Sequence, residues 1–332
     1  MLARQLLLDR SAVTLPRALE RIGGLQSQYA PTMYIGLWSR LARFTRADLT
    51  GALEQRRVVQ GTLMRATIHL VSATDYWPLA LAIGPSRRQW WLRANKGGPT
   101  ARDMQAAAQR VRAALDTAGR LSRKELEEVA GRDATGGVGL WVDLVRVPPS
   151  GTWEHRRADL FAAASDWLGP PPDLAAEDAV DHLVRRYLSG FGPAATHDIA
   201  SWAGMTVGEI SSSIQRLPLR RFRTESGVAL VDLPRLRRPD PEAPVPVRFL
   251  SSWEAVLLAH ARRTGVLAEQ DRPSVFSTRN PHSVNTFLVD GVVAGTWRHT
   301  SGRVDLEPFR ALDRSTRASL REEAERLAAF HA

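Results

Sequence analysis

The sequence contains no cysteine in its 332 residues, and only two of its 45 basic residues are lysines, Lys96 and Lys124. Without cysteine, the chain forms no disulfide, iron–sulfur cluster or thiolate zinc site. It has no apolar run of about 18 residues, so we expect no membrane-spanning helix. The apolar run at Leu6–Leu8 is too short for the core of a signal peptide. These absences predict a soluble, cytoplasmic protein.

Several motifs of nucleotide and metal chemistry are also missing. Neither lysine follows a glycine-rich phosphate loop, and no Gly-x-Ser-x-Gly elbow occurs. The eight histidines lack the spacing of known metal-binding motifs. We therefore expect neither a metal ion nor a cofactor.

What the chain does have is positive charge. Its 45 basic and 35 acidic residues give a formal net charge of +10. Such a balance is typical of proteins that bind a polyanion such as DNA. A basic but otherwise ordinary protein remains the alternative at this point.

The first part of the chain predicts helices followed by a hairpin. Helices are expected at 14–22, around 34–41, and at 49–56 after a capping box that begins at Thr45. Alternating, β-branched residues then predict strands at 58–63 and 65–71. Three helices followed by a hairpin is the order of a winged helix. Residues 75–130 look helical again, and we expect a first module with a helical extension over 1–170.

Two further modules follow the triple proline at 170–172. Helices at 177–188, 196–203 and 207–217 with a hairpin at 219–231 predict a second winged helix over 174–238. A third is expected over 239–332, from a helix at 253–263, a hairpin through Asp290-Gly291, and a C-terminal helix at 315–330. The predicted fold class is α+β, mainly helical, with three tandem winged helix-turn-helix modules.

Five segments together resemble a known family. They are Gly24-Leu25-Gln26-Ser27-Gln28, Leu63-Met64-Arg65-Ala66-Thr67-Ile68-His69-Leu70-Val71, Pro148-Pro149-Ser150-Gly151-Thr152-Trp153, Gly192-Pro193-Ala194-Ala195-Thr196-His197-Asp198 and Leu288-Val289-Asp290-Gly291-Val292-Val293-Ala294-Gly295-Thr296-Trp297-Arg298. In this order, over about residues 3–330, the chain resembles the AlkZ-like DNA glycosylases, which include the bacterial YcaQ (AlkX) proteins. The segment Leu250–Glu254 departs from the family's Leu-Pro-x-x-Asp pattern.

The resemblance implies a fold and a reaction. It implies three winged helices around a concave basic surface for duplex DNA, with a β-hairpin in the cleft. It implies hydrolysis of the N-glycosidic bond of bulky N7-alkylguanine, including interstrand crosslinks, which serves self-resistance in producers of DNA-alkylating compounds. The family's two catalytic glutamines correspond to Gln26 and Gln28. The YcaQ branch has an acidic residue at the position of Gln28, so this chain is similar to the AlkZ branch.

A glutamine pair suits this chemistry. A carboxamide has no usable pKa, but it donates and accepts hydrogen bonds, so two at positions i and i+2 can orient a water beneath C1′. This modest help suffices when the leaving group is good, and N7-alkylated guanine is cationic and leaves readily. Outside the family context, surface or helix-end glutamines would be the simpler interpretation.

Candidate DNA-binding residues come from one strand and from paired arginines. Arg65, Thr67 and His69 alternate, so they are expected on one face of a strand, where His69 could equally be a core-edge residue. The full set of candidates is Arg65, Thr67, His69, Arg156, Arg157, Arg220, Arg221, Arg262, Arg263 and Arg298. Arginines on a solvated face are the alternative.

The prediction is a monomeric, monofunctional DNA glycosylase acting on double-stranded DNA that carries alkylated guanine. Both lysines have the context of surface charges, so we expect no Schiff-base intermediate. The main alternative is a non-catalytic winged-helix DNA-binding protein, such as a transcription regulator. A small-molecule hydrolase or drug-sequestering protein is a third, which the charge disfavours.

Overall fold

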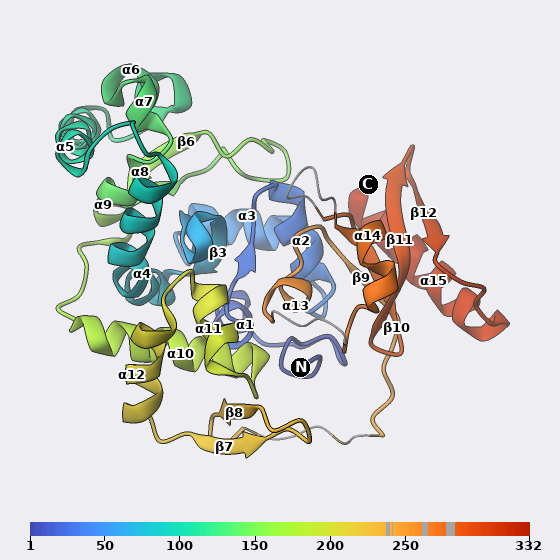
Figure 1. Ribbon diagram of the computed structural model, residues 1–332. Coiled ribbons are helices and arrows are strands. Elements are labelled where there is room, and N and C mark those ends of the chain that lie inside the picture. Colours follow the sequence, from blue (N-terminus) through green and yellow to red (C-terminus); the bar gives the residue numbers. More distant parts are fainter. Residues whose placement is uncertain (237–239, 241, 261–264, 277–282) are drawn as a thin grey trace.

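The computed structural model describes residues 1–236, 240, 242–260, 265–276 and 283–332. Helices and antiparallel sheets are both present, so the predicted α+β class is confirmed. The N-terminal elements lie in the middle of the molecule. A helical part lies on one side of them and a sheet from the C-terminal part on the other (Figure 1).

The N-terminal elements follow the order helix, strand, helix, helix, strand, strand. They are α1 (Leu15–Ile22), β1 (Leu25–Gln26), α2 (Ala30–Trp38), α3 (Arg46–Glu54), β2 (Val58–Thr62), the 3-10 turn η1 (Met64–Ala66) and β3 (Ile68–Ser72). The capping box from Thr45 to Asp48 begins α3, as predicted, and Gly23 ends α1 in the left-handed conformation. The sequence pattern did not predict β1, which is only two residues long and pairs with β3.

The central sheet has six strands in the order β1-β3-β2-β5-β6-β4. Its second half comes from the next part of the chain, which contains α4 (Ala73–Ala94), α5 (Ala101–Ala118), β4 (Leu121–Ser122), α6 (Arg123–Ala130), α7 (Arg132–Thr135), α8 (Gly139–Val142), β5 (Leu144–Arg146), β6 (Leu160–Ala163) and α9 (Ala164–Leu168). Gln60 of β2 pairs with Arg146 of β5, which joins the two halves. The long β5–β6 loop reaches across to α2, where the Tyr34 and Trp153 rings meet at 5.5 Å (Figure 1).

The following stretch has the predicted three helices and hairpin, and their identification as a winged helix stays a prediction. Its elements are α10 (Ala176–Phe191), α11 (Thr196–Ala203), α12 (Val207–Arg216), β7 (Arg220–Arg223) and β8 (Ala229–Asp232). Gly204 makes the turn between α11 and α12 at a φ of 74°, and Thr206 caps α12. An isolated bridge between Ala194 and Val231 ties the hairpin to the helices.

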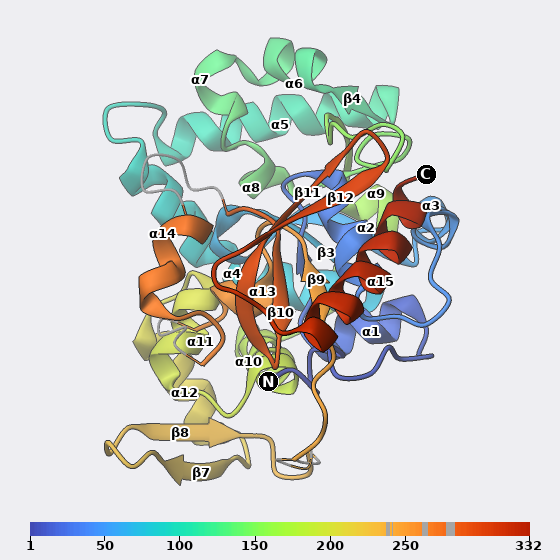
Figure 2. The same ribbon diagram turned by 90° about the vertical axis from the view of Figure 1, so that its right-hand side faces the viewer.

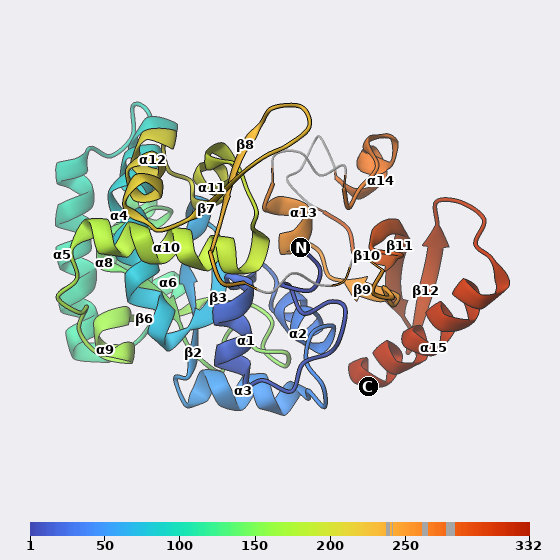
Figure 3. The same ribbon diagram turned by 90° about the horizontal axis from the view of Figure 1, so that it is seen from below.

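The C-terminal stretch forms a four-stranded sheet in the order β12-β11-β10-β9, with a helix against it (Figures 2 and 3). Its elements are β9 (Arg248–Leu250), α13 (Ala255–Leu258), the 3-10 turn η2 (Glu269–Asp271), α14 (Arg272–Val275), β10 (Thr286–Val289), β11 (Val292–Thr300), β12 (Arg303–Pro308) and α15 (Arg314–His331). The hairpin through Asp290-Gly291 is confirmed, with both residues at positive φ. A second turn of this kind, at Ser301-Gly302, adds β12, which the sequence pattern did not predict.

The prediction of a helix beginning at Trp253 is wrong. Trp253 has a φ of 57°, which is incompatible with a helix, and the Glu254 side chain caps the helix that follows it. Within the described residues this helix covers only Ala255–Leu258. The division into modules at 1–170, 174–238 and 239–332 stays a prediction.

Two large core clusters share the N-terminal elements. One joins Val59 and Val71 to Leu183 and Tyr187 of α10. The other joins α1–α3 to the C-terminal sheet and to α15, through residues that include Phe249, Trp297 and Leu327. Among the described helices, none combines the length and apolar character needed to cross a bilayer.

Candidate active site

Gln26 and Gln28 lie at the edge of the central sheet, where β1 meets β3. Gln26 is opposite His69, and the Ser27 N–H donates to the Ile68 carbonyl at 2.8 Å. Gly24, just before β1, has a φ of 80°, and a Cβ there would lie only 3.0 Å from the Leu70 carbonyl oxygen. This glycine therefore lets β1 approach β3 closely, which brings both glutamines to the sheet edge.

The side-chain amides of both glutamines are held by donors from the β2–β3 turn and the first residue of β3. Arg65 Nη2 donates to Gln26 Oε1 at 3.1 Å, and the Ile68 backbone N–H donates to Gln28 Oε1 at 2.9 Å. Because both donors are N–H groups, they identify the oxygen of each amide. Each Oε1 keeps a second lone pair, which is able to accept a hydrogen bond from a bound water.

Arg65 itself is held from two sides. Its Nη1 donates to the Trp202 carbonyl on α11 at 2.8 Å, while its Nη2 holds Gln26. Gly204 makes room for this arrangement, since a Cβ there would lie 3.1 Å from the Arg65 backbone. Arg65 therefore connects the helix–turn–helix of α11 and α12 to the glutamine pair.

The prediction that Arg65, Thr67 and His69 alternate along one strand is wrong. Arg65 and Ala66 both have a φ of 54°, and the Thr67 N–H and hydroxyl both donate to the Met64 carbonyl. These residues therefore form a tight turn, and β3 begins only at Ile68. His69 alone of the three is on the strand, on the face that it shares with Gln26.

His69 is a neutral hydrogen-bonding group. The residue is 3% exposed, and burial, followed by the nearby Arg65 charge, lowers its pKa to about 3. Its Nδ1 lies 3.0 Å from the Thr67 carbonyl oxygen, which can only accept, so Nδ1 carries the hydrogen. Nε2 is then an acceptor.

A cavity of about 850 Å³ opens beside Gln28. We call it the glutamine cavity. Four cations line it, namely Arg123, Lys124, Arg156 and Arg157, together with the carboxylates of Glu127 and Asp159. The predicted candidates Arg156 and Arg157 thus lie beside Gln28, although about 130 residues separate them in the sequence.

Sequence reasoning missed Arg123 and Lys124 as neighbours of the site. The capping box from Ser122 to Glu125 correctly predicts that they lie in the first turn of a helix, α6. It gives no information about which part of the chain that turn faces. The Arg123 N–H donates to the Asp159 carbonyl at 2.8 Å, which holds the start of α6 against the end of the β5–β6 loop, and both line the cavity beside Gln28.

A second cavity, of about 420 Å³, lies on the other side of Tyr29 and Arg156. We call it the aromatic cavity, because its wall includes the rings of Tyr29, Trp153, Trp253, Trp297, His299 and His331. Both cavities share Tyr29 and Arg156, whose hydroxyl and Nη1 are 2.9 Å apart. The predicted DNA-binding residue Arg298 lies at this second cavity, with 3.9 Å between its Nη2 and Glu307.

The remaining candidates lie elsewhere. Arg220 and Arg221 are exposed on β7, far across the molecule from the β5–β6 loop, and the Arg220 guanidinium covers the Phe222 ring (Figure 1). Arg262 and Arg263 lie outside the described residues.

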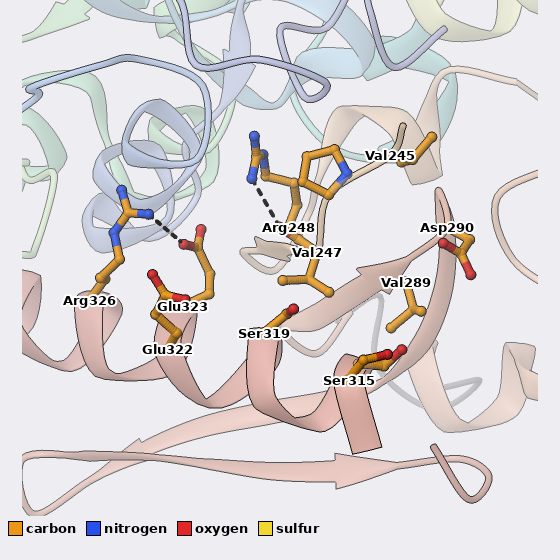
Figure 4. Close-up of a pocket in the computed structure, with 12 residues that line it drawn as sticks. Val245, Val247, Arg248, Val289, Asp290, Ser315, Ser319, Glu322, Glu323 and Arg326 are labelled. Carbon is orange, nitrogen blue, oxygen red and sulfur yellow. Dashed lines mark hydrogen bonds and ion pairs between the residues drawn. The ribbon is translucent and has the colours of Figure 1, made fainter. Parts of the chain in front are cut away.

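A third cavity, of about 320 Å³, lies between α15 and the segment that leads into β9 (Figure 4). Polar and charged side chains line it, with Ser319, Glu322, Glu323 and Arg326 on α15. Arg248 lies opposite them, and its two Nη atoms donate to the carbonyls of Val247 and Leu8. Glu323 is already paired with Arg10 and Arg326. None of the predicted site residues lines this cavity.

No set of three or more histidine, aspartate or glutamate side chains in the described ranges is arranged to hold a metal ion. The site thus combines two fixed carboxamides, a neutral imidazole, and a rim of four cations and two carboxylates. Such groups can hold a water and a phosphate backbone without a charged catalytic base.

Comparison with known proteins agrees with this chemistry. A family model described as "DNA glycosylase AlkZ-like" matches residues 19–330. The solved structure of Streptomyces sahachiroi DNA glycosylase AlkZ is similar in fold, with a TM-score of 0.83, 19% identity, and coverage of 99% of this chain and 94% of that one. A comparison with curated protein sequences gives no match.

Proposed function

Since the chain belongs to the AlkZ-like DNA glycosylases, we propose that it hydrolyses the N-glycosidic bond of bulky N7-alkylguanine in double-stranded DNA. The observation that carries this proposal is the glutamine pair. Both carboxamides are fixed by N–H donors, at 3.1 and 2.9 Å, beside a cavity with a cationic rim. The site can position a water and bind phosphate. This help is sufficient for N7-alkylguanine, because the cationic base is a good leaving group.

In the proposed mechanism, Gln26 and Gln28 hold the attacking water. Each Oε1 uses one lone pair for its structural donor and the other for a hydrogen of the water, so the water's own lone pair faces C1′. The water oxygen forms a bond to C1′ as the bond from C1′ to N9 breaks. The N9 electron pair neutralises the cationic base, and the water proton leaves to solvent.

Arg65 is a positioning residue in this mechanism. Its Nη2 orients the Gln26 amide, and its Nη1 bond to the Trp202 carbonyl keeps the guanidinium in place. Its nearby charge also helps to keep His69 neutral, so that Nε2 remains an acceptor on the same face. We therefore assign Arg65 to the positioning of Gln26 rather than to phosphate binding.

The DNA backbone is proposed to pass along the cations of the glutamine cavity. Arg123, Lys124, Arg156 and Arg157 provide sequence-independent phosphate contacts. The β11–β12 hairpin, which stands out from the C-terminal sheet in Figure 1, is our candidate for the hairpin that enters the cleft. Arg298 on that hairpin, and Arg220, Arg221, Thr67 and His69, stay candidates for further DNA contacts.

Several finer points complete the proposal. The enzyme acts as a monomer in the cytoplasm, with three winged-helix modules around one DNA segment. It unhooks interstrand crosslinks by releasing one of the joined guanines, which serves self-resistance where the host makes a DNA-alkylating compound. Lys124 lines the glutamine cavity, but it is 87% exposed and lies 3.9 Å from Glu128, as expected for a solvated charge.

The test is a single-turnover assay on duplexes that carry N7-methylguanine or a bulky N7-alkylguanine, with released base measured by mass spectrometry. We expect free base, an abasic strand that stays intact until alkali is added, and no adduct after borohydride. Release of other damaged bases but of no N7-alkylguanine would refute the substrate class. A borohydride adduct that is lost in Lys124→Ala would refute direct attack by water. Tight binding to one undamaged sequence without any base release would favour a regulator.

A further inference from the structure

The aromatic cavity has no role in the hydrolysis described above. Six ring-bearing residues contribute to its wall, and no aspartate or glutamate is found among the described residues that line it. Its volume of about 420 Å³ falls in the range of small-molecule sites, which are typically mainly apolar and aromatic with a few polar groups. Through Tyr29 and Arg156 it adjoins the cavity that contains Gln28.

Trp253 is held in this wall by an unfavourable backbone conformation. Its φ of 57° is rare for a bulky residue. Its N–H donates to Ser283 Oγ at 2.6 Å, and the preceding Ser252 N–H donates to Asn285 Oδ1 at 2.9 Å. On the other side, Glu254 forms a fully buried ion pair with Arg40 at 2.6 Å. These contacts secure the backbone on both sides of Trp253.

Trp253 belongs to the segment Leu250–Glu254, which begins at the last residue of β9. Ser252 and Trp253 both line the aromatic cavity, whereas Glu254 makes a buried structural pair. The segment therefore contributes two residues to the wall of the aromatic cavity.

We propose that the aromatic cavity binds the substituent of the lesion, and that this substituent is a flat aromatic ring without positive charge. The inference rests on the proposed function, since an N7 substituent protrudes from the base edge next to the bond that is cut. Rings that line a cavity stack on a planar guest in offset or edge-to-face contact. The two arginines at the rim and the lack of a described carboxylate disfavour a cationic guest. His331 adds no charge, because burial and its cationic neighbours lower its pKa to about 4.

Besides the two rim arginines, Tyr29 and Val284 are the exposed residues of this wall. Tyr29 is 42% exposed and Val284 is 39% exposed, whereas Trp153 and Trp297 are buried and belong to the core. A tryptophan at position 284 can therefore fill the cavity without disturbing the core. Val292 provides a matched control. It is also 39% exposed and is the first residue of β11, and it lines none of the three cavities.

The experiment uses duplexes that carry N7-methylguanine, N7-benzylguanine or N7-cyclohexylmethylguanine, with each rate corrected for spontaneous release. We expect the wild type to release the benzyl adduct faster than the cyclohexylmethyl adduct, which has a saturated ring of the same carbon number. Val284→Trp should lower the ratio of benzyl to methyl release roughly tenfold, the size of one lost aromatic contact. Val292→Trp should leave that ratio unchanged.

The outcomes separate the two hypotheses. Equal release of the benzyl and cyclohexylmethyl adducts by the wild type would overturn the aromatic preference. An equal loss on all adducts, or no loss, in Val284→Trp would overturn the assignment of the cavity. If the wild type releases none of the three bases, the proposed function fails, whatever this cavity binds.

Discussion

The two cavities that meet at Tyr29 and Arg156 differ in how their walls are held. The glutamine cavity is lined by long charged side chains from the start of α6 and from the β5–β6 loop, most of them exposed. The aromatic cavity is lined by rings of which two, Trp153 and Trp297, are anchored in the core. A rim of exposed charges suits any DNA backbone, whereas a wall of fixed rings selects by shape. In our proposals, DNA binding and hydrolysis belong to the glutamine cavity, and the choice of lesion belongs to the aromatic cavity.

The largest effect is expected from the glutamine pair. Gln26→Ala and Gln28→Ala should each slow base release roughly 100-fold or more, because a misplaced nucleophile loses about that factor. DNA affinity should change little, since neither amide binds phosphate in our mechanism. Single-turnover kinetics and equilibrium binding measure the two effects separately. Gln105→Ala, on the exposed face of α5, is the matched control, and wild-type rates in both site variants would refute the assignment.

The next effect is on stability and depends on pH. Native His69 takes up a proton only near its pKa of about 3, whereas the unfolded residue does so near 6.5. Below pH 6.5 the unfolded state therefore binds more protons, and stability falls as the pH is lowered. At pH 4.5 this amounts to about 2–3 kcal/mol. Denaturant unfolding of His69→Asn should show a shallower loss between pH 6.5 and 4.5, whereas exposed His155→Asn should follow the wild type.

Arg65 distinguishes positioning from phosphate binding. Arg65→Met should reduce the single-turnover rate roughly tenfold, because the donor that orients Gln26 is lost. Arg65→Lys should restore part of the rate, since a lysine can make one of the two bonds. The salt dependence of DNA binding should remain as in the wild type. A weaker affinity with a normal rate would instead make Arg65 a phosphate ligand.

The smallest effects are expected at the cationic rim. Alanine at Arg123, Lys124, Arg156 or Arg157 should each weaken DNA binding a few-fold and reduce the log–log salt slope by about 0.9. Arg102→Ala, at the exposed start of α5 and away from both cavities, should leave the slope unchanged. Unchanged slopes in all four rim variants would place the DNA elsewhere on the protein.

Local signals in the sequence predicted most helices and turns. The capping boxes at Thr45 and Ser122, the αL glycine at Gly23 and the Asp290-Gly291 turn each act within a few residues, so their positions follow from spacing alone. The same signals failed at Arg65 and Trp253. Both residues have positive φ, and both are held there by distant partners, Trp202 in one case and Ser283 in the other.

The sequence by itself determined the class of fold and the basic character, because these depend on residue types and short spacings, and its resemblance to a family singled out Gln26 and Gln28 as candidates. Only the tertiary structure decided what surrounds the pair. The end of the β5–β6 loop holds the start of α6 and so brings Arg123 and Lys124 to the cavity of Gln28 across about 95 residues of sequence, and the turn at Arg65 connects α11 to Gln26. Such neighbours are set by sheet pairing and core packing between remote segments, and no local pattern of residues encodes them.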